Sequence, residues 1–162
     1  MTFSIRPFAQ DDRPAVERLL TEAFPTPTES DLVDELRQAE DVIVELVAIE
    51  DGQLVGHVLL SRLNAPMHAL ALGPLGVAPD RQGRGIGTAL VEAAVRDARR
   101  LDVQLVLVLG DPDYYGRFGF SAEDAASYDC VYASHYLMAL RLDPACPRDG
   151  RIIYAAPFNA LG

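Results

Sequence analysis

The stretch LGVAPDRQGRGIGTAL, residues 75–90, predicts an anion-binding turn at the start of a helix. An apolar run ends at Val77, and Gly83, Gly85 and Gly87 then occupy alternate positions ahead of a strongly helical pattern. Glycine permits positive φ angles and lets a ligand come close to the main chain. The backbone amides of such a turn, together with the positive end of the following helix dipole, bind anions. The anion that these features favour is a pyrophosphate.

Three known motifs can be compared with this stretch. A P-loop needs a lysine after its second glycine, and the chain contains no lysine. The dinucleotide fingerprint needs G-x-G-x-x-G early in a βαβ unit, whereas the spacing here is G-x-G-x-G. The third motif, Q-x-x-G-x-G, is spelled by Gln82, Gly85 and Gly87 after a Val-x-Pro formed by Val77 and Pro79. It resembles the acyl-CoA-binding motif of the GNAT superfamily of N-acetyltransferases. Because strand, proline, glutamine, glycines and helix occur in order, a ligand-binding turn is favoured over a purely structural one.

The length and composition favour a single globular domain, residues 1–162, because 49% of the residues are hydrophobic. The chain shows no basic region joined to an apolar run and no apolar segment long enough to cross a bilayer, so we expect a cytoplasmic protein without membrane contacts. The cysteines, Cys130 and Cys146, are expected to be free thiols. The three histidines show no metal-ligand spacing, and we expect no metal.

The charge balance points away from nucleic acid. Fourteen cations, all arginine, face 24 carboxylates, which gives a formal net charge of −10. Nucleic-acid binders normally show the opposite balance. An acidic surface instead attracts cationic partners such as protonated amines.

The remaining pattern predicts an α/β sandwich with a mixed sheet. Asp51-Gly52 between two apolar runs is the strongest hairpin signal, and residues 103–110 are typical of a buried parallel strand. The predicted helices cover residues 11–23, 28–36, 85–101 and 113–118, and the predicted strands cover residues 3–8, 42–50, 54–63, 67–77, 103–110, 132–142 and 151–155.

A second constellation, DPDYYGRFGF at residues 111–120, extends the resemblance. GNAT enzymes carry a similar segment after the strand that follows the cofactor helix, and Tyr115 stands at the position of the family's general acid. The block is similar to the YhbS-like branch of the family, as is the ending GRIIYAAPF, residues 150–158. The resemblance covers nearly the whole chain. It implies a mixed, mostly antiparallel sheet of six to seven strands flanked by about four helices.

The resemblance also implies a site for acetyl-CoA as co-substrate. The backbone amide of Gly76 or Val77 would polarise the thioester carbonyl, and Tyr115 would protonate the leaving thiolate. Pantetheine would lie between two splayed strands, residues 75–77 and 107–109. Arg84 is better placed than Arg117 to meet phosphate. The cofactor-binding residues expected are Leu75, Gly76, Val77, Gln82, Gly83, Arg84, Gly85, Ile86, Gly87, Thr88, Leu109 and Tyr115.

Several points stay open. The general base is His68, a water chain or no group at all, because the strand before Val77 offers no glutamate, while His57 is expected to be structural. The acceptor is a small-molecule or peptide amine, expected to enter beside residues 24–30, where Glu29, Asp31 and Asp34 add negative charge. The protein is a monomer or homodimer. The alternatives to an N-acetyltransferase with direct attack in a ternary complex are a catalytically silent acyl-CoA-binding module and a nucleotide or phosphosugar binder.

Overall fold

The computed structural model describes residues 2–161, which form a mixed sheet between two helical layers. Within these residues a seven-stranded sheet has the spatial order β1-β2-β3-β4-β5-β7, and β9 pairs with the far end of β3. The strands are β1 (Ser4–Pro7), β2 (Val42–Glu50), β3 (Gln53–Asn64), β4 (Ala69–Val77), β5 (Leu105–Leu109), β7 (Leu137–Arg141) and β9 (Ile153–Tyr154). A separate two-stranded sheet joins β6 (Tyr128–Asp129) and β8 (Gly150–Arg151).

The strand directions confirm the predicted fold class. In the seven-stranded sheet, β4 and β5 pair in parallel, and the other described pairs are antiparallel. The parallel pair is connected through α3 (Ile86–Arg100), which provides the crossover that parallel strands require. The parallel strand expected within residues 103–110 is therefore β5.

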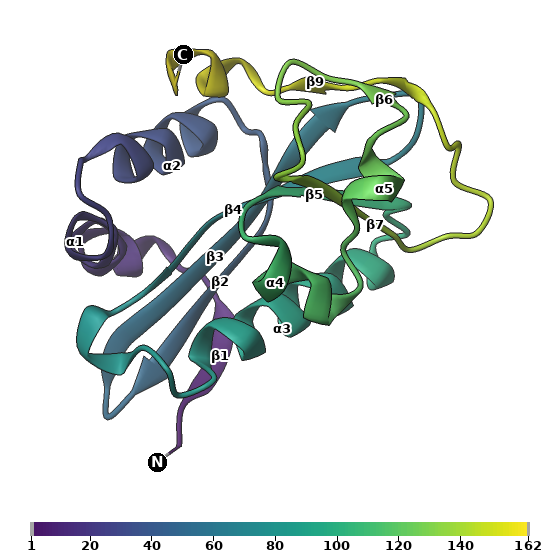
Figure 1. The fold of residues 1–162 in the computed structure, drawn as a ribbon. Helices are drawn as coiled ribbons and strands as arrows, with labels where there is room; N and C mark the ends of the chain where they lie inside the picture. The colour runs from purple at the N-terminus through teal and green to yellow at the C-terminus, as the bar shows by residue number, and fades with distance from the viewer. Residues whose placement is uncertain (1, 162) are drawn as a thin grey trace.

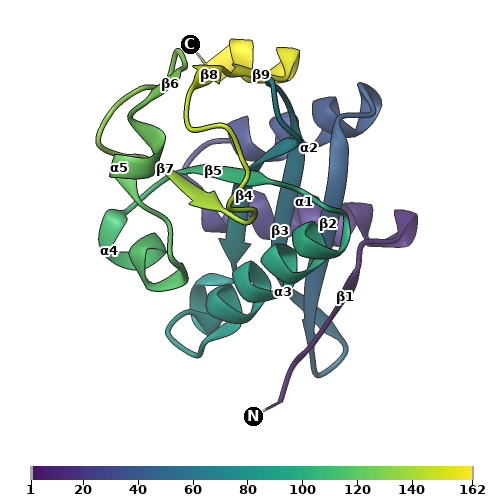
Figure 2. The ribbon, with the colours of Figure 1, turned by 90° about the vertical axis from the view of Figure 1, so that its right-hand side faces the viewer.

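The helices cover both faces of the sheet (Figures 1 and 2). The buried apolar side chains of α2 (Thr28–Gln38), with Val16 and Leu20 of α1 (Arg13–Ala23), belong to one core cluster, and those of α3 belong to the other. Two short helices, α4 (Pro112–Tyr115) and α5 (Ala122–Ala125), follow β5, so five α-helices are described where about four were expected. The 3-10 segments are η1 (Gln10–Asp12), η2 (Pro79–Arg81), η3 (Gly116–Phe118) and η4 (Ala156–Leu161).

The β2–β3 hairpin forms where the sequence predicts it. Asp51 and Gly52 have φ angles of 52° and 74°, and Glu50 pairs with Gln53 directly beside them. Two central residues with positive φ match the right-handed twist of the flanking strands, so this turn sets the pairing of β2 with β3 beside it.

The C-terminal third differs from the expectation. The strand predicted over residues 132–142 is limited to Leu137–Arg141, because the Ser134 hydroxyl accepts a hydrogen bond from the amide of Tyr136 at 3.2 Å and holds the preceding segment in a turn. The strand predicted over residues 151–155 is divided between β8 and β9, which join different sheets. The elements β6 and α5 were not predicted.

Helix α3 lies close to the sheet because β3 carries glycine beneath it. A Cβ atom at Gly56 would lie 2.8 Å from Leu90 Cδ1 and 3.0 Å from Ile86 Cγ2, both fully buried side chains of α3. Gly56 is also paired with Val77, the last residue of β4. The close contact therefore sets the position of the α3 N-terminal half relative to the end of β4.

We expect Gly56→Ala to lower the free energy of unfolding by about 1–3 kcal/mol, since an added methyl overpacks this contact. Urea unfolding of the purified variant measures the change. Gly116→Ala is the matched control, because Gly116 has a φ of −56° and no atom within 4 Å of an added Cβ. Equal stability of the two variants would show that α3 can move away from β3 without cost.

Candidate active site

Strands β4 and β5 part at the centre of the molecule. They pair only as far as Leu72, which lies opposite Val108. Beyond that point β4 continues along β3 to Val77, while β5 continues along β7 to Leu109. Within the described residues, the second half of β4 therefore has no strand partner on the side that faces β5. The splay expected from the sequence is present at residues 75–77, but of residues 107–109 only Leu109 lies beyond the paired region.

The parting leaves one edge of β4 without strand partners. The amide of Ala78 donates to Val55 O on β3 at 2.8 Å. Backbone groups of successive residues in a strand point to opposite edges, so Gly76 points toward β3 and Val77 points toward the gap. The Gln82 side chain donates to Val77 O at 3.4 Å. Of the two amides considered from the sequence, that of Val77 is therefore the one on the gap side.

The glycine turn forms a cradle at the end of β4 nearest α3. Gly83 and Gly85 have φ angles of 77° and 85°, and Gly85 is the N-cap of α3. The first helical turn closes with the amide of Ala89 bonded to Gly85 O at 3.0 Å, so the three amides before it point out of the helix end. A cavity of about 330 Å³ lies here, lined by Val77, Arg81, Gln82, Gly83, Gly85, Ile86, Gly87, Thr88, Tyr114 and Arg117.

The arginines around the cradle are placed differently from the expectation. Arg84 does not line the cavity, and its Nη1 lies 3.4 Å from Oε1 of the buried Glu50. Arg81 Nε lies 2.6 Å from the same oxygen. Arg117 does line the cavity, with its guanidinium 4.5 Å from the centre of the Tyr114 ring. Arg117 is thus the arginine of the two that lines the cradle, and the expected phosphate contact of Arg84 stays a prediction.

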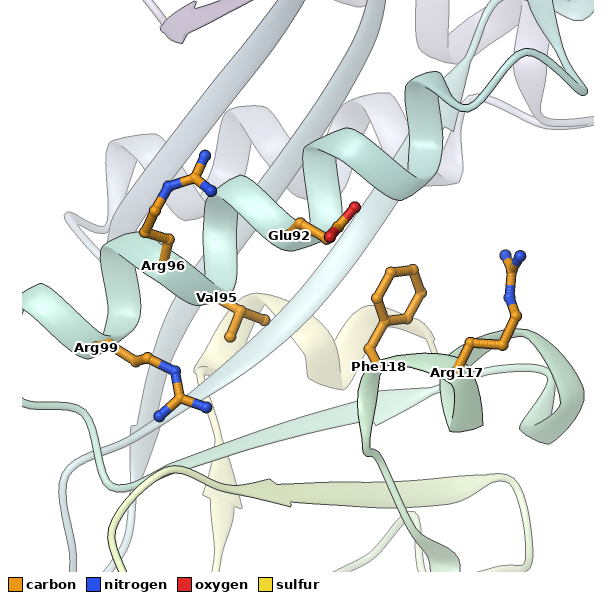
Figure 3. Close-up of a pocket in the computed structure, with 6 residues that line it drawn as sticks. All are labelled: Glu92, Val95, Arg96, Arg99, Arg117 and Phe118. Atoms are coloured by element: carbon orange, nitrogen blue, oxygen red, sulfur yellow. The ribbon is translucent and has the colours of Figure 1, made fainter.

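A second groove adjoins the cradle at Arg117 (Figure 3). It has a volume of about 420 Å³ and runs between α3 and the facing η3 segment. Three of the residues that line it are arginines, which makes the groove cationic beside the anion cradle. The lining residues are Glu92, Val95, Arg96 and Arg99 on α3 and Arg117 and Phe118 on η3.

Tyr115 is held firmly at the other end of the gap. Its ring packs edge-on against Phe120 and Tyr114, at centroid distances of 5.8 and 5.0 Å. A Cβ atom at Gly110 would lie 2.4 Å from Tyr115 Cε2, so only glycine fits beneath the ring. Burial, followed by the neighbouring Tyr114, raises the pKa of Tyr115 to about 12. The hydroxyl is therefore fully protonated at neutral pH and can act as a proton donor.

The Tyr115 ring borders a cavity of about 360 Å³ on the side of the sheet covered by α2 and η4. Figure 1 shows α2 and the yellow C-terminal segment side by side there. Leu75 and Leu109, from the two parting strands, lie in its wall. The rest of the lining comes from Phe24, Glu29, Leu32, Ala71, Leu72, Gly73, Pro74, Tyr132, Tyr154 and Phe158.

The N-terminal wall of this cavity matches the region expected for the acceptor only in part. The irregular segment is shorter than residues 24–30, because α2 already begins at Thr28. Phe24 and Glu29 line the cavity, but Asp31 does not. Asp34 instead lies 3.2 Å from Arg37 Nη1. Of the three expected carboxylates, Glu29 is the one that borders the cavity.

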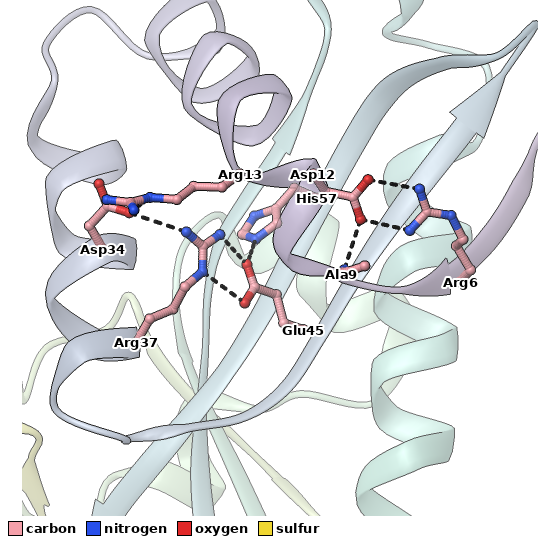
Figure 4. Close-up of polar contacts among 8 residues, drawn as sticks. All are labelled: Arg6, Ala9, Asp12, Arg13, Asp34, Arg37, Glu45 and His57. Atoms are coloured by element: carbon pink, nitrogen blue, oxygen red, sulfur yellow. Dashed lines mark hydrogen bonds and ion pairs between the residues drawn. The ribbon is translucent and has the colours of Figure 1, made fainter.

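Neither His57 nor His68 is placed as a base for this cavity. His57 is fully buried, and its Nε2 lies 2.7 Å from Glu45 Oε2 in a network with Arg37 (Figure 4). Burial raises the pKa of Glu45, but hydrogen bonds with His57 and Arg37 outweigh it and give a net decrease. His68 directly precedes β4 and is not among the residues that line the cavity.

Metal-ligand clusters and membrane-spanning helices are both absent from residues 2–161. No group of three or more His, Cys, Asp or Glu side chains in this part of the chain is arranged to hold a metal ion. None of the described helices is long and apolar enough to span a bilayer.

The comparisons with known proteins agree with this geometry. The model of the Acetyltransferase (GNAT) family matches residues 13–120, which include the cradle and Tyr115. The chain belongs to this family. The uncharacterized N-acetyltransferase YjhQ of Escherichia coli strain K12 is 36% identical over 120 residues, covering 68% of this chain and 65% of that protein. The uncharacterized N-acetyltransferase YhbS of the same strain is 33% identical over 122 residues, covering 73% and 72%. The match therefore spans just under two thirds of YjhQ.

Two solved structures are similar along nearly the whole chain. YhbS from Escherichia coli, a GNAT family N-acetyltransferase in complex with CoA, superposes with a TM-score of 0.91 at 27% identity, covering 99% of this chain and 93% of that one. A GNAT family acetyltransferase from Brucella melitensis in complex with acetyl-CoA has a TM-score of 0.83 at 31% identity, covering 97% and 98%.

Proposed function

We propose that this protein transfers an acetyl group from acetyl-CoA to a primary amine by direct attack in a ternary complex. The observation that carries the proposal is the continuity of three features. The cradle lies at the Val77 end of β4, and the edge of β4 beyond Leu72 has no partner in β5. Tyr115 lines the cavity that Leu75 and Leu109 of the two parting strands also border. The CoA and acetyl-CoA bound to the two similar structures support the same assignment.

The residues of the cradle fit a pyrophosphate. The amides of the three residues before Ala89 can donate hydrogen bonds to an anion, and the positive end of the α3 dipole attracts its charge. We assign the pyrophosphate to the residues from Gln82 to Thr88, with Arg117 rather than Arg84 as the cation that faces it. The pantetheine arm then follows the gap-side edge of β4 past Val77 and Leu75, where it can bond like an added strand.

The reaction uses two groups of this chain. Acetyl-CoA, when bound, supplies a thioester whose carbonyl carbon can accept an amine. The Val77 amide donates a hydrogen bond to the carbonyl oxygen and stabilises the charge that develops there. The amine nitrogen forms the new C–N bond as the C–S bond breaks. The ammonium first loses one proton to solvent, which gives the neutral nucleophile. Tyr115 then gives its proton to the leaving sulfur and regains one from the nitrogen that has attacked.

Gly85→Val should weaken CoA binding by about tenfold or more, because a β-branched residue is strained at a φ of 85° and the turn must shift. Gly85→Asn is the matched control, since asparagine tolerates the left-handed region and an added Cβ meets no atom within 4 Å. Calorimetric titration with CoA, and with ATP for comparison, measures the effect. CoA affinity that is unchanged in a folded valine variant, or ATP bound more tightly than CoA, would contradict the assignment.

Tyr115→Phe should lower kcat by about 10²–10⁴-fold while the dissociation constant for CoA stays the same, because only the proton donor is removed. Thiol release with a responsive amine measures turnover. Tyr136→Phe removes a hydroxyl from a half-exposed tyrosine outside both cavities and should leave kcat unchanged. Parent turnover in the Tyr115 variant would assign proton donation to another group.

The raised pKa of Tyr115 predicts the alkaline side of the pH profile. A donor works while it is protonated, so a pKa of about 12 moves the loss of kcat well above pH 10. We expect kcat to rise with pH as the bound amine loses its proton, and not to decrease at any pH up to about 10.5. Circular dichroism at each pH checks the fold. A decrease centred near pH 10 would indicate a tyrosine without the burial seen here.

A further inference from the structure

The cavity beside Tyr115 combines an aromatic wall with a single charged group. Tyr132 and Tyr154 meet edge to face at a centroid distance of 4.8 Å, and Tyr154 meets Phe158 in the same way at 5.1 Å. The Tyr132 hydroxyl is fixed by donating to Phe158 O at 3.2 Å. Among the described residues that line the cavity, Glu29 alone carries a formal charge. The lining is therefore built for a ligand that is mainly apolar and has one complementary charge.

Glu29 lacks a partner for one of its oxygens. Its Oε1 is shielded from solvent and has no hydrogen-bond partner within the described chain. Burying a carboxylate oxygen in apolar surroundings is costly unless a donor or cation is supplied. Glu29 lies in the first turn of α2. The ion pair within this helix joins Asp34 to Arg37 and does not include Glu29. Glu29 also has no ion pair within the described residues, and because it lines the cavity, a cationic ligand there can supply its counter-charge.

The surrounding rings favour the same kind of ligand. Phe24, Tyr132, Tyr154 and Phe158 border the cavity, and aromatic faces attract ammonium groups as well as apolar substituents. The cavity holds about 360 Å³, which suits a small molecule. A polycation would leave its further charges against apolar walls without counter-charges, which is unfavourable.

We propose that Glu29 binds the ammonium group of the acceptor, and that the acceptor is a small monocationic primary amine with an aromatic or apolar substituent. This inference rests on the proposed function, because it places the amine on the side of the gap where Leu75, Leu109 and Tyr115 meet the cavity. Glu29 acts as a specificity-determining residue. The cavity selects against polyamines and against acceptors that carry a carboxylate beside the amine.

The test is a binding titration of the full chain saturated with CoA, which prevents turnover. The probe is 2-phenylethylammonium, and 2-phenylethanol serves as its uncharged analogue. We expect Glu29→Gln to weaken binding of the ammonium by at least about tenfold and to leave binding of the alcohol unchanged, because only the charge pair is lost. Spermidine should bind more weakly than 2-phenylethylammonium to the unsubstituted protein.

Glu35→Gln is the matched control. Glu35 is an exposed residue of the same helix and does not line the cavity, so the variant removes the same charge from the surface of α2. It should bind the ammonium like the unsubstituted protein. The inference would be overturned if Glu29→Gln and Glu35→Gln lost the same ammonium affinity, or if Glu29→Gln lost affinity for the ammonium and the alcohol equally. It would also be overturned if spermidine bound more tightly than 2-phenylethylammonium, or if the CoA complex did not bind 2-phenylethylammonium. Each of these results would leave the proposed function standing. Failure of the protein to bind CoA at all would overturn the proposed function itself.

Discussion

The parting of β4 from β5 after Leu72 is the constraint on which the rest of the site depends. A paired strand has its donors and acceptors satisfied by its neighbour, whereas an unpaired edge must find other partners. Here the gap-side amide of Val77 has no strand partner within residues 2–161, while its carbonyl accepts from Gln82. The same crossover that makes β4 and β5 parallel places the N-terminus of α3 beside Val77. One connection therefore supplies both the extended edge and the anion cradle.

Close packing of α3 on β3 holds the cradle in place relative to the core. Gly56 lets Ile86 and Leu90 approach the sheet, and Val77 lies directly across from it. The first residues of α3 are thus fixed by apolar contacts beneath them while their amides stay open to the cradle. A preorganised anion site requires a rigidly packed backbone whose amides are free to donate to the anion, and the start of α3 meets both conditions.

The sequence predicted the parts of the fold that depend on local chemistry. Asp51-Gly52, the apolar β5 run and Gly85 at the start of α3 each specify their conformation within a few residues, and the structure matches them. The C-terminal elements could not be predicted, because β6, β8 and β9 are two residues long and pair with distant partners. Likewise, the motif indicated Tyr115, but the aromatic wall of Tyr132, Tyr154 and Phe158 depends on tertiary packing. The positions of the two arginines also depend on tertiary packing, because Arg117 lines the cradle whereas Arg84 lies near Glu50.

Two adjacent tyrosines divide the site into its two halves. Tyr114 lines the cradle and Tyr115 lines the aromatic cavity, although only one peptide bond separates them. Glycines make this possible, because Gly110 leaves space for the Tyr115 ring and Gly87 lets the Tyr114 hydroxyl come within 3.0 Å of where a Cβ would lie. The two rings touch edge to face, so neither can turn without moving the other. The spacing between the cradle and the Tyr115 ring is therefore set by a four-residue helix, α4.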